Sequence, residues 1–217
     1  MNKCFIIGGG ESLVGFDFTI LKDHDVIAVN NSILDAPFAK YFITMDYTFI
    51  DYKINKNLFS SFPATKFFVV AINNNYIQYK NNQYIDTRNN YKYDLSLINY
   101  VVPAKHEFGI GNSIQNFVHG CCSGYSALQL AIVLGYTEIY LLGIDMTASA
   151  KTHYHAGYNA NLSFFKNKLR FYYPLFLKGL YAIKKDFPLV KIYSCSEHSP
   201  LNREIEYKPL EELKNDL

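Results

Sequence analysis

Short apolar runs separated by polar turns recur along this chain and predict buried β-strands. The first run, Lys3–Ile7, leads directly into three glycines. Runs without regular polar alternation are typical of strands in a parallel sheet that is covered on both faces. Further strands are predicted at 25–29, 40–44, 66–71, 139–142 and 191–195.

Two stretches are predicted to be helices, one from the residues at its ends and one from the spacing of its apolar side chains. Ser123 and Gly124 are suited to cap and open one helix, and Gly135 to end it in the left-handed conformation. Over residues 162–187, apolar side chains recur at alternating spacings of three and four, which predicts a long helix with one buried face. Because proline has no backbone N–H, Pro174 predicts a kink or a break in that helix.

Alternating strands and helices predict an α/β, Rossmann-like fold with a mainly parallel sheet and helices on both faces. The chain is expected to form a single domain over residues 1–217, in which residues 146–160 make a short lid over the carboxyl ends of the strands. The polar tract 73–99, rich in Asn and Tyr, is expected to be a mobile excursion or a small accessory layer. A short polar helix is predicted at 209–217.

Small or polar residues follow four of the predicted strands. They are Gly8, Gly9, Gly10 and Ser12 after the first strand, Asn30 and Asn31 after the second, Asp46 after the third and Asp145 after the fifth. The carboxyl ends of parallel strands meet at one edge of the sheet, where ligands bind in open α/β folds, so we expect these residues to lie together. Ser123 and Gly124 are placed to join them.

The glycine turn indicates a phosphate site. Glycines let the backbone approach a ligand closely, and a helix after the turn would aim its free N–H groups at an anion. Simpler interpretations stay open: a bare strand-to-helix turn for the glycines, ordinary turn residues for the asparagines, and a helix cap for Asp145 or Ser123.

The segment after Asp145 concentrates titratable and hydroxyl groups at His153, Tyr154, His155 and Tyr158. An imidazole over the strand ends, with an ordinary pKa of about 6.5, is suited to accept a proton from a hydroxyl nucleophile. Two other interpretations stay open. The two histidines and Asp145 could be metal ligands, or the segment could be a surface loop without a chemical role.

Composition indicates which binding partners and which cellular compartment to expect. The net charge of +2 arises without a long basic run, so duplex nucleic acid is not expected as a partner. The four cysteines include no CxxC pair, which argues against a structural zinc site and predicts free buried thiols. No stretch approaches the ~20 apolar residues of a membrane span, and the first apolar run is too short for a signal peptide. A cytoplasmic protein is expected.

Three segments resemble one known family. IIGGGESL near the N-terminus, DVIAVNNS at the second strand and above all SGYSALQLAIVLGYTEIYLLGID from Ser123 onward are similar to the bacterial sialyltransferases of glycosyltransferase family 42 and the related motility accessory factor type proteins. The likeness is fainter in the HYH loop and in IYSCSEHSPLN, and weak over residues 48–117.

The resemblance implies a nucleotide-binding Rossmann-like domain that transfers a sugar, sialic acid-like or related, from a CMP-activated donor to a glycan hydroxyl. It further implies inversion at the transferred sugar and no need for a metal or another cofactor. A nucleotide sugar and a glycan acceptor would be the partners, and homo-oligomerisation is left open.

Roles follow from the resemblance position by position. It implies that the donor phosphate is surrounded by Gly8, Gly9, Gly10 and Ser12. The nucleotide or sugar would be contacted by Asn30 and Asp46, and the sugar carboxylate would be held by Ser123 and Gly124. It makes His153 or His155 the general base and lets Tyr154 or Tyr158 stabilise the departing phosphate.

Three positions depart from the sialyltransferase pattern. Gly9 and Asp46 stand where those enzymes have asparagines, and Thr147 stands where they have a tyrosine. The resemblance therefore specifies a nucleotide-dependent transferase rather than a particular donor sugar.

Two other functions fit the same fold. Diphosphate transfer, as in the related pterin pyrophosphokinases, would need Mg²⁺ held by carboxylates such as Asp46 and Asp145. A non-catalytic nucleotide- or glycan-binding module would bind its ligand without transfer.

Overall fold

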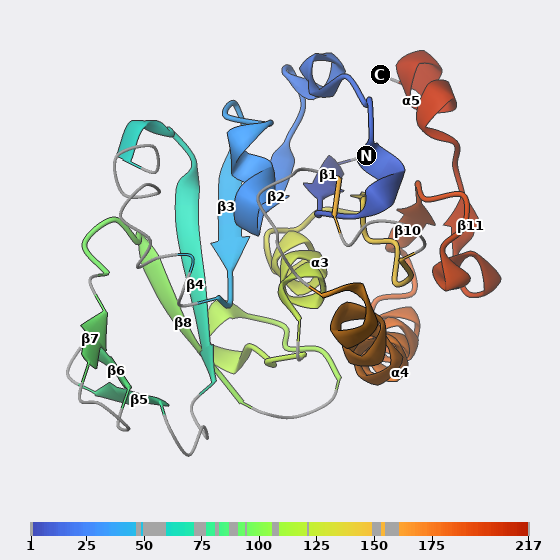
Figure 1. Ribbon diagram of the computed structural model, residues 1–217. Helices are drawn as coiled ribbons and strands as arrows, with labels where there is room; N and C mark the ends of the chain where they lie inside the picture. The colour runs from blue at the N-terminus through green and yellow to red at the C-terminus, as the bar shows by residue number, and fades with distance from the viewer. Residues whose placement is uncertain are drawn as a thin grey trace.

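An eight-stranded, all-parallel sheet forms the centre of the protein (Figure 1). The computed structural model describes residues 2–46, 49, 60–71, 77–80, 83–86, 91–93, 95–105, 109–120, 122–148, 153–154 and 161–216. The strands of this sheet are β1 (Lys3–Ile7), β2 (Val26–Val29), β3 (Tyr41–Thr44), β4 (Thr65–Ala71), β8 (Tyr100–Ala104), β9 (Glu138–Leu142), β10 (Lys191–Ser194) and β11 (Glu206–Tyr207). The mainly parallel sheet predicted from the sequence is confirmed, and β8 and β11 are additional to it.

The strand order is β11-β10-β9-β1-β2-β3-β4-β8, so the sheet grows outward in both directions from its centre. On one side β1 pairs with β2, and on the other with β9, where Ile7 lies opposite Leu142. The junction of β1 and β9 is therefore a topological switch point. Connections beyond such a pair of strands leave in opposite directions and open a crevice at the carboxyl edge.

Alternate side chains of the strands enter two separate cores. In β1, Ile6 joins one core and Phe5 the other, as the two-residue period of a strand requires. The first core is completed by α3 (Ser123–Val133) and α4 (Leu162–Asp186), and the second by residues of α5 (Leu210–Asp216) and of three 3₁₀ turns. The 3₁₀ turns of the chain are η1 (Glu11–Leu13), η2 (Phe18–Leu21), η3 (Asn30–Leu34), η4 (Ile114–Asn116) and η5 (Pro200–Arg203). Helical residues thus cover both faces, as predicted.

The caps of α3 differ in one respect from the expected ones. Cys122, not Ser123, is the N-cap residue, and its Sγ accepts a hydrogen bond from the backbone N–H of Tyr125. Ser123 is the first helical residue, and its hydroxyl accepts from the N–H of Met45 rather than capping the helix. Gly135 follows the helix with φ +85°, which confirms the predicted left-handed ending.

Helix α4 runs without interruption through Pro174, so the predicted break is absent. Its start is capped by Asn161, whose side chain accepts from the N–H of Phe164. Its second half is anchored in the first core by Phe176, Leu180 and Ile183. Both sides of the proline are therefore held, and the lost backbone hydrogen bond does not end the helix.

Two further predictions are corrected or resolved by the structure. The glycine turn is followed by the three-residue turn η1 rather than by a helix. In the polar tract, strands β5 (Ile77–Lys80), β6 (Gln83–Asp86) and β7 (Tyr91–Tyr93) form a small antiparallel sheet, which is the accessory layer of the two alternatives.

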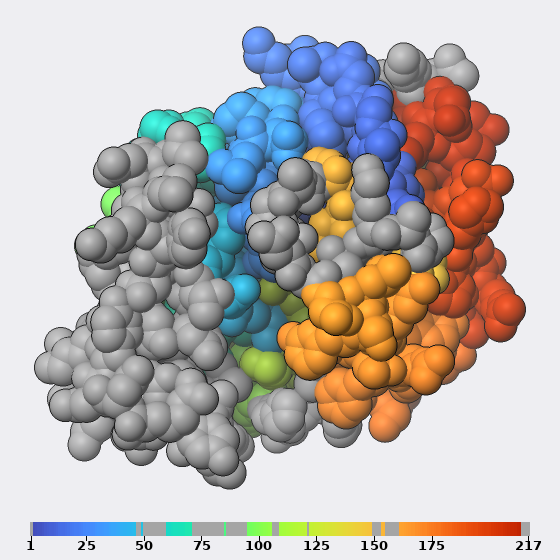
Figure 2. Space-filling view, in the orientation of Figure 1, coloured from blue at the N-terminus to red at the C-terminus, as the bar shows by residue number. Residues whose placement is uncertain are grey.

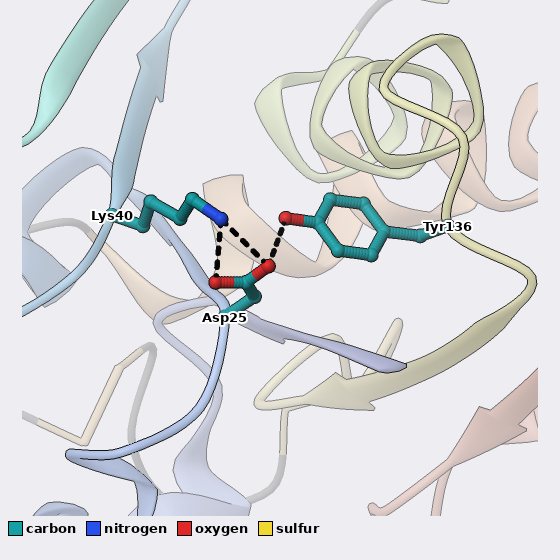
Figure 3. Close-up of polar contacts among 3 residues, drawn as sticks. All are labelled: Asp25, Lys40 and Tyr136. Atoms are coloured by element: carbon teal, nitrogen blue, oxygen red, sulfur yellow. Dashed lines mark hydrogen bonds and ion pairs between the residues drawn. The ribbon is translucent and has the colours of Figure 1, made fainter. Parts of the chain in front are cut away.

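A polar cluster joins the amino ends of three strands (Figure 3). Nζ of Lys40 lies 2.8 Å from each carboxylate oxygen of Asp25, and the hydroxyl of Tyr136 donates to the same carboxylate over 2.6 Å. Burial alone would raise the pKa of Asp25, but the hydrogen bonds from Lys40 and Tyr136 outweigh it and hold that pKa below its ordinary value. We call Asp25, Lys40 and Tyr136 the amino-edge cluster.

Cys4 and Cys195 are buried free thiols, as predicted, and Cys122 is a partly buried one. Cys121 lies outside the described residues. Within the described part of the chain, no helix is both long and apolar enough to cross a membrane.

Candidate functional site

The glycine turn is fixed to the end of β9 by backbone contacts. The N–H of Gly8 donates to the carbonyl of Leu142, and the N–H of Gly10 to that of Gly143, each over 2.8 Å. A Cβ on Gly8 would lie 2.5 Å from the carbonyl oxygen of Gly143, so only glycine permits this approach. The turn therefore joins β1 and β9 at the switch point.

Asp145 holds the residues that follow the glycine turn. One carboxylate oxygen accepts from the hydroxyl of Ser12 over 2.6 Å, and the other from the N–H of Ser12 over 2.9 Å. Asp145 is buried, and a Cβ on Gly10 would lie 2.4 Å from its carboxyl carbon. Asp145 thus holds the start of η1 from a distant part of the chain, which differs from the local cap of a following turn that the sequence left open.

These contacts direct three donors of the glycine turn into the fold. The N–H groups of Gly8, Gly10 and Ser12 all donate to the segment between Leu142 and Asp145. Backbone donors for an anion at this edge must come mainly from elsewhere. The first turn of α3, which begins at the same edge, carries N–H groups of the required kind.

The asparagine after β2 is oriented by the strand beside it. The hydroxyl of Thr44 accepts from the N–H of Asp46 over 3.0 Å, so its own hydrogen is directed to Oδ1 of Asn30 over 2.7 Å. This contact fixes which end of the Asn30 side-chain amide is the oxygen. The amide NH₂ group is then the end that can donate hydrogen bonds. Asn30 has φ +53°, a left-handed conformation that asparagine tolerates better than most residues.

The start of α3 is tied to the end of β3. The hydroxyl of Ser123 accepts from the N–H of Met45 over 3.2 Å, and the hydroxyl of Ser126 contacts Sδ of Met45 at 3.1 Å. A Cβ on Gly124 would lie 3.0 Å from Cδ1 of Ile144, so α3 also packs closely against the segment after β9. The helix N-terminus is positioned between two strand ends.

His153 and Tyr154 contact the glycine turn. The N–H of Tyr154 donates to the carbonyl of Gly9 over 3.0 Å, and the imidazole of His153 packs on Gly9 and lies 4.9 Å from the ring of Phe165. A Cβ on Gly9 would lie 2.7 Å from Cδ2 of His153. The imidazole therefore occupies the space that an asparagine at position 9 would need, which explains the glycine in this chain.

Tyr154 points away from His153. Its hydroxyl donates to Asp35 over 2.7 Å, and its ring packs 5.6 Å from that of Phe18. The Tyr154 side chain packs on the second core, and its hydroxyl is engaged with Asp35 rather than placed in the cleft. His155 and Tyr158, the other candidates in this segment, lie outside the described residues.

Most of the predicted residues line one cleft of about 550 Å³ at the switch point. They are Gly8, Gly9, Gly10, Asn30, Asp46, Ser123, Gly124, Asp145 and His153. Ser12 lines a neighbouring cavity of about 450 Å³ that shares Asp145 and Thr147 with the cleft, and Asn31 lines neither. Figure 2 shows the segment after β9, in yellow-orange, reaching the surface between the blue N-terminal part and α4.

One wall of the cleft was not identified from the sequence. It comes from the first half of α4, which contributes Phe165, Lys168, Leu169 and Tyr172. The spacing of Phe165, Leu169 and Tyr172 was interpreted as a core-facing stripe, yet these three side chains are only partly buried and the core begins at Phe176. A lysine at position 168, inside an apolar pattern, was the available signal.

Charge in the cleft is mixed. Asp46 and Asp145 are acidic residues of the lining, and Lys168 is the one lysine or arginine among its described residues. His119, which the sequence interpretation also missed, adds a second imidazole. In the described ranges, no three His, Cys, Asp or Glu side chains are grouped as metal ligands.

Comparison with known proteins identifies solved structures that have a similar fold. No family model matches the chain, and no curated protein matches its sequence. The chain is similar in structure to the sialyltransferase CstII from Campylobacter jejuni in complex with the substrate analogue CMP-3FNeuAc, with a TM-score of 0.55 and 21% identity over 96% of this chain and 87% of that one. A point variant of the sialyltransferase Cst-II in complex with CMP gives a TM-score of 0.53 and 20% identity over 95% and 86%. The chain therefore has the fold of these sialyltransferases.

Proposed function

We propose that this chain is a glycosyltransferase that moves a sugar from a CMP-activated donor to a hydroxyl group of a glycan. One observation carries the proposal: the cleft at the switch point gathers a glycine turn, a helix N-terminus and an imidazole at the carboxyl edge of the sheet. The fold supports it, since the compared sialyltransferases hold CMP or a CMP-sugar analogue.

The walls of the cleft suit an anionic donor. N–H groups at the start of α3 would bind the phosphate, and Lys168 of α4 would supply a positive charge. Asn30 and Asp46 would contact ribose, base or sugar hydroxyls, and Ser123 would hold the sugar carboxylate. This arrangement gives α3 the phosphate-binding role that the sequence assigned to the glycine turn.

The proposed reaction is a single displacement with inversion. The imidazole of His153 would take the proton of the acceptor hydroxyl while the hydroxyl oxygen forms a bond to the anomeric carbon of the donor sugar. The bond from that carbon to the phosphate oxygen breaks, and its electron pair leaves with CMP. His153 is the described lid histidine at the cleft, and His155 keeps its place as the other candidate base.

Stabilisation of the departing CMP is assigned to residues other than Tyr154, while Tyr158, which lies outside the described residues, stays a candidate. The hydroxyl of Tyr154 is bonded to Asp35, and Thr147 replaces the tyrosine of the sialyltransferase pattern. Lys168 and Tyr172 of α4 line the cleft and would carry this role together with the start of α3. The positive charge of Lys168 would then help to stabilise the departing phosphate, a role that the resemblance gave to tyrosine hydroxyls.

Donor consumption tests the proposal. The purified chain is incubated with CMP-activated sugars and a glycan acceptor, with and without EDTA, and release of CMP and glycosylated product are measured. We expect transfer that survives EDTA. A reaction that occurs only with Mg²⁺ and transfers diphosphate would replace this function, and nucleotide binding without any transfer would leave a non-catalytic module.

A further inference from the structure

Helix α4 concentrates the positive charge of the chain. It contains six of the 21 lysines and arginines but only one of the 19 acidic residues. The helix alone therefore carries +5, whereas the rest of the chain carries −3. Charge of one sign on one surface element is a feature of binding to an oppositely charged surface.

Large aromatic side chains are exposed on the same helix. Phe164 is 58% exposed and Phe171 is 62% exposed, which is unusual for phenylalanine. Lys178 and Lys185 follow at further intervals of seven and are also exposed. Because seven residues are nearly two helical turns, these four side chains form one stripe along α4. We call Phe164, Phe171, Lys178 and Lys185 the outer stripe.

The outer stripe is separate from the wall of the cleft. Phe165 and Leu169 face the cleft, whereas Phe164 and Phe171 lie on the adjoining outward face, and Nζ of Lys168 lies 4.7 Å above the ring of Phe164 between the two. In Figure 2 the orange side chains of α4 lie at the surface. A surface held by the outer stripe would therefore lie next to the mouth of the cleft.

We propose that α4 docks the protein on an anionic phospholipid bilayer through the outer stripe. Phenylalanine rings partition into the boundary between head groups and acyl chains, and lysines on the same helix are attracted by anionic head groups. The helix lies in the interface and does not span it. The inference needs only this surface and does not depend on the proposed reaction, although it would suit transfer to a glycan carried by a lipid.

Charge decides between the bilayer and a second copy of the chain. Two α4 helices packed face to face would bring together two helices of net charge +5, with Lys178 and Lys185 in the contact, and like charges disfavour such contact. An anionic bilayer neutralises the same charge. The bilayer is therefore the occupant that the outer stripe fits.

Vesicle sedimentation of the full chain tests the proposal. Vesicles of phosphatidylcholine alone are compared with vesicles that also contain phosphatidylglycerol, at low and at high salt. We expect sedimentation only with the anionic vesicles and its loss at high salt. The paired substitutions Lys178→Gln and Lys185→Gln should weaken partitioning about fivefold per lysine, and Phe164→Ser with Phe171→Ser at least about tenfold.

Matched control residues lie on the surface over the second core, away from α4. Val14 and Leu34 are exposed apolar residues next to Leu13 and Ile33 of the second core, and Val14→Ser with Leu34→Ser should leave vesicle binding unchanged. Lys22→Gln serves the same purpose for charge, and thermal unfolding shows that each variant folds. The proposal is overturned if the chain does not bind anionic vesicles, if the outer-stripe variants bind as well as the controls, or if they instead convert a dimer to a monomer in light scattering.

Discussion

The two edges of the central sheet use similar polar residues in opposite ways. At the amino edge, Asp25, Lys40 and Tyr136 bond to one another and join the starts of β2, β3 and β9. At the carboxyl edge, Asn30, Asp46 and His153 line a cleft of about 550 Å³. The paired carboxylate of Asp25 contributes to stability, whereas the side chains at the carboxyl edge border a space that a ligand could enter; Asp145 does both, since it also bonds to Ser12. The end of a parallel strand at which a polar residue lies thus indicates whether it can belong to the candidate site.

Removal of the imidazole at the carboxyl edge should have the largest effect. We expect His153→Ala to lower the transfer rate about 10²- to 10⁴-fold, the range for loss of a general base, with the affinity for CMP nearly unchanged. Rates under donor saturation and calorimetric affinities measure the two separately. His155→Ala is the matched variant. If it lowers the transfer rate while His153→Ala leaves the rate unchanged, His155 and not His153 is the general base.

A methyl group in the glycine turn should come next. We expect Gly10→Ala to weaken CMP binding at least about 30-fold, because its Cβ would meet the carboxylate of Asp145 and displace the contacts to Ser12. Calorimetry measures the affinity. Gly15→Ala is the control, since it adds strain of about 1 kcal/mol at φ +79° in open space and should leave affinity unchanged. Equal affinities for the two variants would remove the glycine turn from the site.

Loss of the cation in the cleft should have a moderate effect. We expect Lys168→Gln to weaken binding of CMP about fivefold to tenfold but binding of cytidine less than about twofold, because only CMP carries the phosphate charge. Fluorescence or calorimetric titration with both ligands measures the difference. Lys166→Gln changes the same charge on an exposed position outside the cleft lining and should change neither affinity. A Lys168 variant that loses both ligands equally would contradict a phosphate contact.

The amino-edge cluster should give the smallest effect, and only on stability. Asp25 and Lys40 are partly exposed, so we expect Asp25→Asn to lower the free energy of unfolding by about 1 kcal/mol or less at neutral pH. The folded-state pKa of Asp25 is lowered, so its contribution is present above the unfolded pKa of about 3.9 and is lost as the pH falls through the folded value. Denaturant unfolding from neutral to acid pH measures this. Transfer activity should be unchanged, and an activity loss in a stable variant would contradict the separation of the edges.

The sequence predicted the parts of the fold that depend on local pattern. The apolar runs located six strands of the sheet, and Gly135 marked the end of α3. Strand β8 was missed because Pro103 interrupts its pattern, and the sheet order places it at an edge, where proline is tolerated. Strand β11 has only two residues, too few for a periodic signal.

The cleft was predicted in outline because polar residues at the ends of parallel strands must share one edge. Its details depend on contacts between distant residues. The packing of His153 on Gly9 links positions 144 residues apart, and no local pattern reports it. The stripe of α4 looked like core throughout, since a cleft wall and a core face need the same spacing. Only the burial of Phe176 against the partial exposure of Leu169 separates the two halves.

The central claim is that the carboxyl edge of the sheet binds a CMP donor. Calorimetric titration of CMP into the wild-type chain and into the Gly10→Ala and Asp25→Asn variants tests it most directly. The account requires saturable binding by the wild type, a similar affinity for Asp25→Asn and a strong loss for Gly10→Ala. No binding by the wild type, or three equal affinities, would contradict it.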